Sequence, residues 1–125
     1  MQNKSPEMTN ITISDGKTEL HAVLNEKAAA RDFVRRLPCR MKGTDSGTEY
    51  CCPAAIGVFD PMEAQTGWKN GDIALCGGWF MILYGGEDES SAYRNMMIIG
   101  HLDDDSAEAV REMPHQVEFT VRLSE

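Results

Sequence analysis

Residues 66–84 contain a complete β-hairpin signal, which constrains the fold more than any other part of the chain. A short apolar run at 72–76 is followed by Gly77 and Gly78, and a run of bulky residues then extends over 79–84. Adjacent glycines adopt the positive φ angles of a tight two-residue turn without steric cost. Aromatic and branched side chains favour strands. The segment therefore predicts two antiparallel strands joined by the two glycines.

Alternating apolar residues predict further strands at both ends of the chain. Residues 9–14 alternate around two isoleucines, an Asp-Gly turn signal follows, and residues 18–24 alternate again. Residues 117–123 alternate cleanly between apolar and polar positions. Residues 95–102 contain an uninterrupted apolar run, which indicates a strand that is buried on both faces.

The middle of the chain carries weaker patterns. Residues 39–46 are polar and contain glycine, so we expect a loop there. Residues 47–52 and 55–59 are expected to be strands that Pro53 separates. The connection over 60–71 is expected to be a loop that leads into the hairpin. A glycine-rich acidic segment after this hairpin is expected to form an exposed loop.

Two short helices are predicted. Apolar residues at i, i+3, i+4 and i+7 indicate an amphipathic helix with Asn25 as its N-cap, and Pro38 ends it. The second helix is expected to have Asp105 as its N-cap, with Glu108 three residues later in capping-box spacing. Pro114 ends this helix.

These elements predict a mainly β protein with one closed barrel of about eight strands and two short helices. Glycine turns between many of the strands are typical of a barrel, and a closed sheet leaves no exposed edges for other chains to pair with. A chain of 125 residues has enough apolar surface for one core. We assign residues 1–8 to a flexible N-terminal segment and residues 9–125 to the barrel domain.

The charge of the chain limits its partners. Twelve basic and twenty acidic side chains give a formal net charge of −8, which repels nucleic-acid phosphates and anionic lipids. No segment approaches the roughly 20 apolar residues that a membrane-spanning helix needs. The first ten residues lack the apolar centre of a signal peptide. We therefore expect a cytoplasmic protein without a nucleic-acid or membrane partner, and a homodimer stays open as an alternative.

The residues that commonly carry redox, metal or catalytic chemistry do not form a known motif here. Cys39, Cys51, Cys52 and Cys76 contain no Cys-x-x-Cys spacing, and we expect them to be reduced. The acidic run 103–105 lacks EF-hand spacing and is explained by helix capping. The three histidines lie far apart in the sequence without a serine or carboxylate motif. We predict no metal, no cofactor and no catalytic residue.

Seven short segments occur in an order and spacing that together are more specific than any one of them. They are Ile11-Thr-Ile13, Leu37-Pro38, Gly47-Thr-Glu-Tyr50, Gly67-Trp68, Gly71-Asp-Ile73, the run from Trp79 to Tyr84, and Ile99-Gly100. With these segments the chain resembles, nearly from end to end, the bacterial and archaeal cyclophilin-like domain family. This family comprises small barrels that are related in fold to the cyclophilin prolyl isomerases, and the resemblance implies the same closed barrel.

The resemblance also identifies where the chain departs from the true isomerases. In those enzymes an arginine after the first helix donates a hydrogen bond to the proline amide, and a Phe-Met-x-Gln segment forms the proline pocket. Arg40 is similar in position, but residues 41–50 contain no Phe-Met-x-Gln, and residues 85–95 contain neither tryptophan nor histidine. Because lowering the barrier to prolyl rotation needs both a donor and a clamp for the ring, one arginine does not suffice.

We therefore predict a non-catalytic module that binds a small molecule or a peptide. The Glu49 carboxylate would hold a cation or an amide, and tyrosine and methionine side chains would form the rim. Both tryptophans, Trp68 and Trp79, are expected to lie in the core. Two alternatives remain, a weak peptidyl-prolyl isomerase and a structural or assembly domain. The candidate ligand-binding residues are Arg40, Glu49, Tyr50, Tyr84, Tyr93 and Met96.

Overall fold

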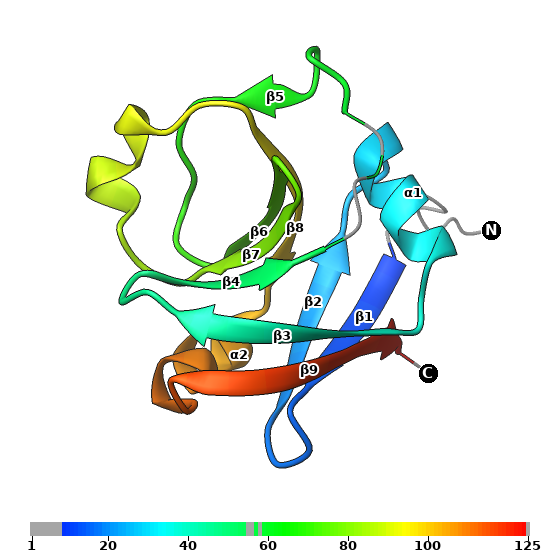
Figure 1. Ribbon diagram of the computed structural model, residues 1–125, viewed down its shortest axis with the longest axis vertical. Coiled ribbons are helices and arrows are strands. Elements are labelled where there is room, and N and C mark those ends of the chain that lie inside the picture. The colour runs from blue at the N-terminus through cyan, green and yellow to red at the C-terminus, as the bar shows by residue number, and fades with distance from the viewer. Residues whose placement is uncertain (1–8, 55–56, 58, 125) are drawn as a thin grey trace, which may run out of the picture.

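Nine antiparallel strands form one sheet in the computed structural model, which describes residues 9–54, 57 and 59–124. Neighbouring strands follow the order β2-β1-β9-β3-β4-β7-β6-β8-β5 (Figure 1). A further pairing between β2 and β8 joins the two sides of the sheet. Eight strands therefore close into a barrel, and β5 is an extra strand on β8. The predicted closed, mainly β barrel is confirmed.

The elements have the following bounds. The strands are β1 (Thr9–Ser14), β2 (Glu19–Leu24), β3 (Cys39–Asp45), β4 (Glu49–Pro53), β5 (Ala64–Gln65), β6 (Asp72–Cys76), β7 (Trp79–Leu83), β8 (Met96–Leu102) and β9 (Gln116–Leu123). The α-helices are α1 (Ala28–Arg35) and α2 (Asp104–Ala109), and two 3₁₀ helices are η1 (Glu87–Ala92) and η2 (Val110–Glu112). Among the described residues, no helix combines the length and the apolar character needed to cross a bilayer.

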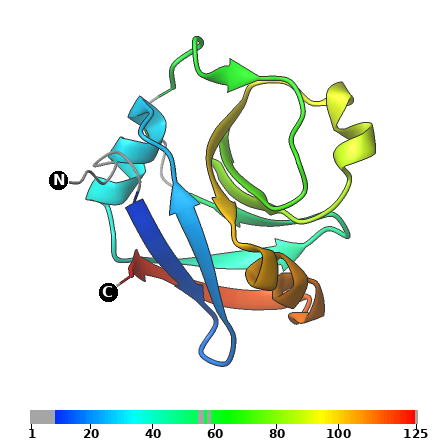
Figure 2. The same ribbon diagram turned by 180° about the vertical axis from the view of Figure 1, so that it is seen from behind.

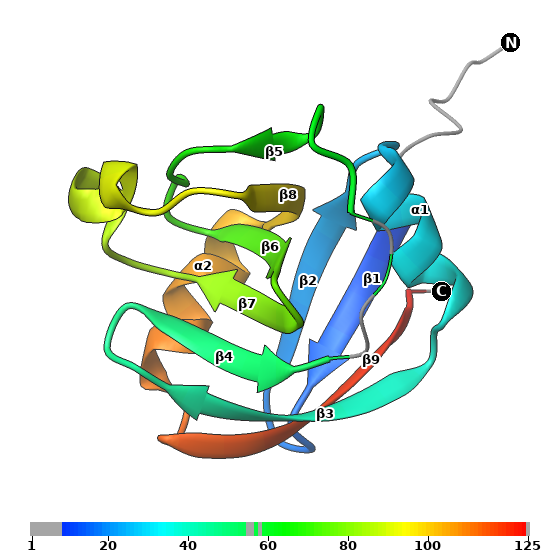
Figure 3. The ribbon, with the colours of Figure 1, turned by 45° about the horizontal axis from the view of Figure 1, so that its top comes forward.

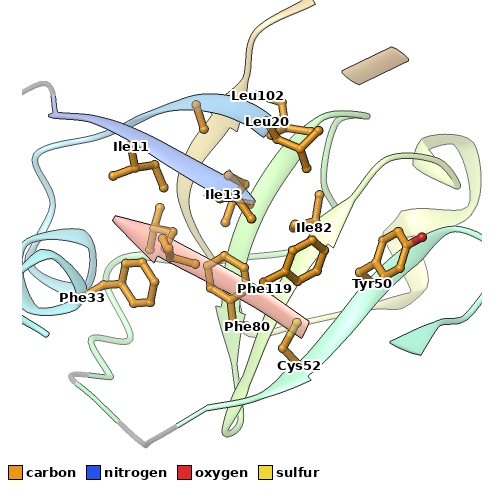
Figure 4. Close-up of a cluster of buried hydrophobic side chains, with 14 of the residues drawn as sticks. Ile11, Ile13, Leu20, Phe33, Tyr50, Cys52, Phe80, Ile82, Leu102 and Phe119 are labelled. Atoms are coloured by element: carbon orange, nitrogen blue, oxygen red, sulfur yellow. The ribbon is translucent and has the colours of Figure 1, made fainter. Parts of the chain in front are cut away.

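The core fills the inside of the barrel, and the barrel strands contribute their inward-facing side chains to it (Figure 4). Helix α1 contributes Phe33, whose ring stacks on that of Phe80 with 5.2 Å between centroids. The Phe119 ring packs edge-on against Tyr50 at 5.6 Å. Burial of each large apolar side chain stabilises the fold by about 1.5–3 kcal/mol. The same alternation leaves the other side of each strand outside the barrel, where a functional surface can form.

Both helices begin at residues other than those predicted. Helix α1 has Lys27 at its N-cap, and the Asn25 side chain instead donates to the Ile98 carbonyl oxygen at 2.7 Å. The Glu63 carboxylate accepts hydrogen bonds from the first backbone N–H groups of α1, at 2.7 and 3.3 Å, and so replaces a local cap. Helix α2 is capped by Asp103, which accepts from the Ser106 N–H at 2.8 Å, and not by Asp105.

The loop predicted over 39–46 is wrong, because this segment is strand β3. Its inward positions include Gly43, where a Cβ atom would lie 2.9 Å from the Cys52 sulfur and 3.0 Å from the Phe119 ring. Glycine here relieves crowding inside the barrel and does not form a turn. The loop predicted between Phe59 and the hairpin also contains the short strand β5. The predictions for residues 1–8 and for 55, 56 and 58 lie outside the described residues.

The pairing between β6 and β8 contains a β-bulge. Ile73 pairs with Gly100, whereas the next residue, Ala74, pairs with Ile98. Strand β8 therefore carries one additional residue, Ile99, at this point. The bulge shifts the alternation of β8 relative to its neighbour.

Candidate functional site

An apolar surface covers the outside of the four strands β4, β7, β6 and β8, which follow one another in Figure 3. The strand register aligns outward positions in rows across these strands. One row contains Cys51, Met81, Ala74 and Ile98, which are paired in that order. The adjacent row contains Pro53, Trp79 and Cys76. We call this surface the apolar face; it comprises Cys51, Pro53, Ala74, Cys76, Trp79, Met81, Leu83 and Ile98.

The indole of Trp68 covers one part of the apolar face. It is 7% exposed and packs in a second apolar cluster with Ala74, Leu83 and Met96. The indole Nε1–H donates a hydrogen bond to the Gly85 carbonyl oxygen at 2.9 Å. This part of the face is therefore closed by the protein's own loops.

Several hydrogen bonds fix these loops to each other. The Trp68 backbone N–H donates to the Ser90 hydroxyl at 3.0 Å, and that hydroxyl lies 2.8 Å from the Glu87 carbonyl oxygen. Asn70 and Glu87 bond reciprocally, since each backbone N–H donates to the other side chain, at 2.9 and 3.1 Å. The ring of Tyr93 lies 5.3 Å from that of Trp68. Helix η1 and the segment around Trp68 thus form one fixed wall beside the apolar face.

The other part of the apolar face, along β4 and β7, is open. Trp79 is 45% exposed, and Tyr93 at the wall is 56% exposed. Met81 and Cys51, in the next row of the same strands, are half-buried. The prediction that both tryptophans lie in the core is thus confirmed for Trp68 and wrong for Trp79. Trp79 points outward at the start of its strand, where its cross-strand neighbours are Pro53 and Cys76.

Glu49 lies at one end of this open strip. The Thr48 hydroxyl donates to one carboxylate oxygen, and the Cys51 thiol lies 3.4 Å from the other. Burial raises the pKa of Cys51 to about 12, and the Glu49 carboxylate contributes to this shift. The ion pairs found among the described residues all use other carboxylates than Glu49. Glu49 is therefore an oriented anion without a cationic partner in the described part of the chain.

Two of the predicted ligand-binding tyrosines are structural. Tyr50 is fully buried, and its hydroxyl points away from the core cluster in Figure 4 and donates to the Pro114 carbonyl oxygen. Burial raises the pKa of Tyr50 to about 12. Tyr84 is also buried, and its hydroxyl donates to Asp45. Burial and this bond raise the pKa of Tyr84. The Arg111 guanidinium donates to the Tyr84 carbonyl oxygen at 3.1 Å, so this group joins η2 to the barrel.

The remaining predicted residues divide between two sites. Met96 is buried beneath Trp68, so its predicted position on a rim is wrong. Arg40 has a 71% exposed side chain that lies 3.4 Å from Glu118 on β9. It stands four residues before Thr44, which pairs with Cys51, and this separation is about 13 Å along an extended strand. The structure therefore keeps Glu49 and Tyr93 beside the apolar face but separates Arg40 from it.

Sequence reasoning missed Cys51, Met81 and Ile98 as surface residues. The run from Trp79 to Leu83 is apolar at every position, and such a run indicates burial on both faces of a strand. Only the pairing of distant strands shows which alternate side chains meet outside the barrel. Groups of three or more His, Cys, Asp or Glu side chains arranged to hold a metal are absent from the described residues. All four cysteines are free thiols, as expected.

The outside of β2, β1 and β9 is polar, in contrast with the apolar face. These three strands lie side by side in Figure 2, and their register aligns Thr12 with both His21 and Arg122. The Thr12 hydroxyl lies 2.7 Å from that of Ser124, and Arg122 pairs with Glu19 at 3.3 Å. A hollow of about 460 Å³ is lined by these five residues. We call this surface the polar face.

Comparison with known proteins agrees with the architecture. The chain is similar to the hypothetical protein AF2241 from Archaeoglobus fulgidus, whose solution structure superposes with a TM-score of 0.69 at 14% sequence identity. The superposition covers 98% of this chain and 100% of the archaeal one, and at this identity it shows the fold alone. The search of curated proteins finds no match. The cyclophilin-like family matches over residues 13–122, and the chain therefore belongs to this family.

Proposed function

We propose that this protein is a non-catalytic binding module that holds a small molecule or a peptide on the open part of its apolar face. The observation that carries the proposal is the exposure of Trp79 and Tyr93 on and beside a strand surface that also presents Met81 and Cys51. Tryptophan and tyrosine are the residues most often responsible for binding energy at protein surfaces. A contiguous exposed apolar surface marks a contact site.

The fixed wall formed by η1 and the Trp68 segment supports the same proposal. A binding surface that is already ordered loses little conformational entropy when a ligand arrives. Tyr93 is held against Trp68, and Trp68 is held by bonds to Gly85 and Ser90. Met81, with its flexible thioether, can adapt to ligands of different shape.

The geometry does not favour the isomerase alternative. Prolyl isomerisation needs a hydrogen-bond donor directed at the amide nitrogen of a clamped proline. Arg40, the expected donor, is paired with Glu118 and separated from the aromatic side chains of the apolar face. We assign no catalytic role to any residue.

A ligand screen by thermal shift tests the proposal. A ligand at a hundred times its dissociation constant adds roughly 2.7 kcal/mol of stability. We expect at least one compound or peptide to stabilise the wild-type protein and to lose this effect with Trp79→Ala. Leu123→Ala is the matched control, since Leu123 is 49% exposed on β9, away from the apolar face.

Two outcomes would contradict the proposal. One is a ligand that stabilises Trp79→Ala as strongly as the wild type, with amide chemical-shift changes confined to the polar face. The other is a broad screen in which nothing shifts the melting temperature, while sedimentation shows a dimer that Trp79→Ala dissociates. The second result would favour the assembly role.

A further inference from the structure

We propose that the ligand of the apolar face is an extended peptide segment with apolar side chains followed by a lysine or arginine, whose cationic group pairs with Glu49. This inference rests on the proposed function and specifies the ligand class. It follows from the spacing of the rows on β4 and β7 and from the position of the unpaired carboxylate.

The first step concerns the spacing. Three successive cross-strand pairs follow one another on β4 and β7: Pro53 with Trp79, Cys51 with Met81, and Glu49 with Leu83. In the third pair Leu83 is covered by Trp68, so Glu49 alone ends the open strip. Successive pairs are two residues apart on each strand, which corresponds to about 6.6–6.8 Å. An extended peptide repeats its side chains on one face with the same period. A peptide that lies along these strands can therefore place alternate side chains over successive pairs.

The second step concerns the order of chemistry along the strip. The pair containing Trp79 and the pair containing Met81 are apolar, and the third pair ends the strip with the carboxylate of Glu49. Matching side chains on a peptide are apolar at two alternate positions and cationic at the next one. A ligand that contacts all three pairs must extend over about 13 Å, which is the length of five residues of extended peptide counted from first to last.

The third step concerns charge. Glu49 is oriented by hydrogen bonds from Thr48 and Cys51, and it has no part in the ion pairs of the described residues. A Cβ atom on Gly86 would lie 3.1 Å from the Thr48 side chain, so the start of η1, with Glu87, adjoins the same end of the strip. The net charge of −8 adds a long-range attraction for cations. Charge complementarity therefore favours a basic peptide over an acidic one.

Selection from a random octapeptide library, with counter-selection on Trp79→Ala, tests this inference. We expect enriched peptides with apolar residues at two alternate positions and lysine or arginine two residues beyond. For the strongest peptide, replacing this cation with glutamine should weaken binding about three- to fivefold, the factor expected for an exposed ion pair. The difference should decrease as salt rises from 50 to 300 mM, because salt screens exposed charges.

Glu49→Gln should weaken binding of the cationic peptide by the same factor and leave the affinity for its glutamine version unchanged. Glu108→Gln is the matched control, because Glu108 is exposed on α2 and its substitution changes the net charge equally. If both variants lose the same affinity for the cationic peptide, the effect comes from the net charge of the protein and not from Glu49. That result would contradict the proposed pairing with Glu49. Enriched peptides without basic residues would also overturn the inference and leave the proposed function intact.

Two further results would also decide against a basic peptide. If no peptide distinguishes the wild type from Trp79→Ala, the peptide inference fails, and a small molecule that does so would preserve the proposed function. A dimer in sedimentation that Trp79→Ala converts to monomer would show that a second copy of the chain occupies the apolar face, and both proposals would then fail.

Discussion

The outside of this barrel is polar over β2, β1 and β9 and apolar over β4, β7, β6 and β8. Strands that face water on one side normally alternate between apolar inward and polar outward residues, and β1 follows this rule with Thr12 beside His21 and Arg122. Strand β7 breaks the rule, since Trp79 and Met81 point outward while their neighbours fill the core. The difference shows that the apolar side chains outside the barrel are concentrated on four neighbouring strands.

The apolar half is itself divided between a closed and an open part. The protein's own Trp68 covers Ala74 and Leu83, whereas no comparable side chain among the described residues covers Trp79. Two tryptophans in one small barrel thus have different roles. The first stabilises the fold, and we propose that the second binds a ligand.

The largest effect should separate these two tryptophans. Trp68→Ala should lower the free energy of unfolding by about 3–5 kcal/mol, because it leaves a cavity over Ala74 and Leu83. Trp79→Ala should cost no more than about 1 kcal/mol, since much of the ring is already in water. Urea unfolding followed by circular dichroism measures both values. Similar losses for the two variants would contradict the division of the apolar face.

A second prediction tests whether the sulfur atoms on the apolar face are reactive. A thiol with a pKa of about 12 has a thiolate fraction at pH 8 that is roughly a thousandfold below that of a free cysteine. Greater intrinsic nucleophilicity offsets part of this difference, so we expect iodoacetamide to alkylate Cys51 roughly a hundredfold more slowly than glutathione. Peptide mass mapping over time gives the rate.

The Glu49→Gln variant should accelerate alkylation of Cys51 and leave the rate at Cys39 unchanged, because the Glu49 carboxylate adds to the pKa shift of Cys51 and not to that of Cys39. Protein unfolded in urea should react at the rate of free thiols. Alkylation of folded Cys51 at the glutathione rate would contradict the raised pKa of this thiol.

The third prediction concerns the helix that lies beside the polar face. The hydrogen bond from Ser106 lowers the pKa of Asp103 below its ordinary value of 3.8. A lowered folded-state pKa contributes stability that is present above the unfolded value and is lost as the pH falls through the folded value. Asp103→Ala should therefore cost about 1 kcal/mol at pH 7, and the difference from wild type should shrink below pH 4.

Asp105→Ala is the matched control, since Asp105 lies two residues further along and does not cap α2. We expect it to change stability by less than Asp103→Ala at every pH. A difference between wild type and Asp103→Ala that is constant from pH 7 to pH 2 would refute the capping role of the ionised carboxylate.

The smallest effect is expected at the exposed ion pair of the polar face. Arg122 and Glu19 lie 3.3 Å apart with both side chains about half exposed, so a double-mutant cycle with Arg122→Gln and Glu19→Gln should give a coupling below about 0.5 kcal/mol. This coupling should vanish in 0.5 M salt. A coupling above 1 kcal/mol would show that the polar face contributes more to stability than its exposure suggests.

The barrel could be predicted from the sequence because short runs of neighbouring residues specify its turns. Gly77 and Gly78 have φ angles of 55° and 91°, as the hairpin signal requires. Strand β3 was missed because its outward residues are polar and its inward Gly43 resembles a loop residue. The reason for that glycine, contact with Cys52 and Phe119, depends on distant strands.

The site was only partly predictable for the same reason. Glu49 was predicted as the polar end of a pocket and Tyr93 as a rim residue beside a glycine-rich acidic loop, and both remain predictions that agree with the apolar face. Tyr50 has the same appearance in the sequence, yet the closed barrel places its ring in the core and its hydroxyl on Pro114. Met81 became visible as a surface residue only through its pairing with Cys51 across two strands.

The bulge at Ile99 determines which side chains of β8 lie outside the barrel. In a regular strand, residues three apart lie on opposite faces, so Ile98 and His101 would point in different directions. The additional residue acts as a phase shift that brings both to the exterior, one beside the tryptophan-covered cluster and the other to Asp72 at 2.8 Å. Deleting Ile99 would therefore leave a regular strand that still presents Ile98 and His101 to the exterior, and it would cost the core the Ile99 side chain, which is 1% exposed.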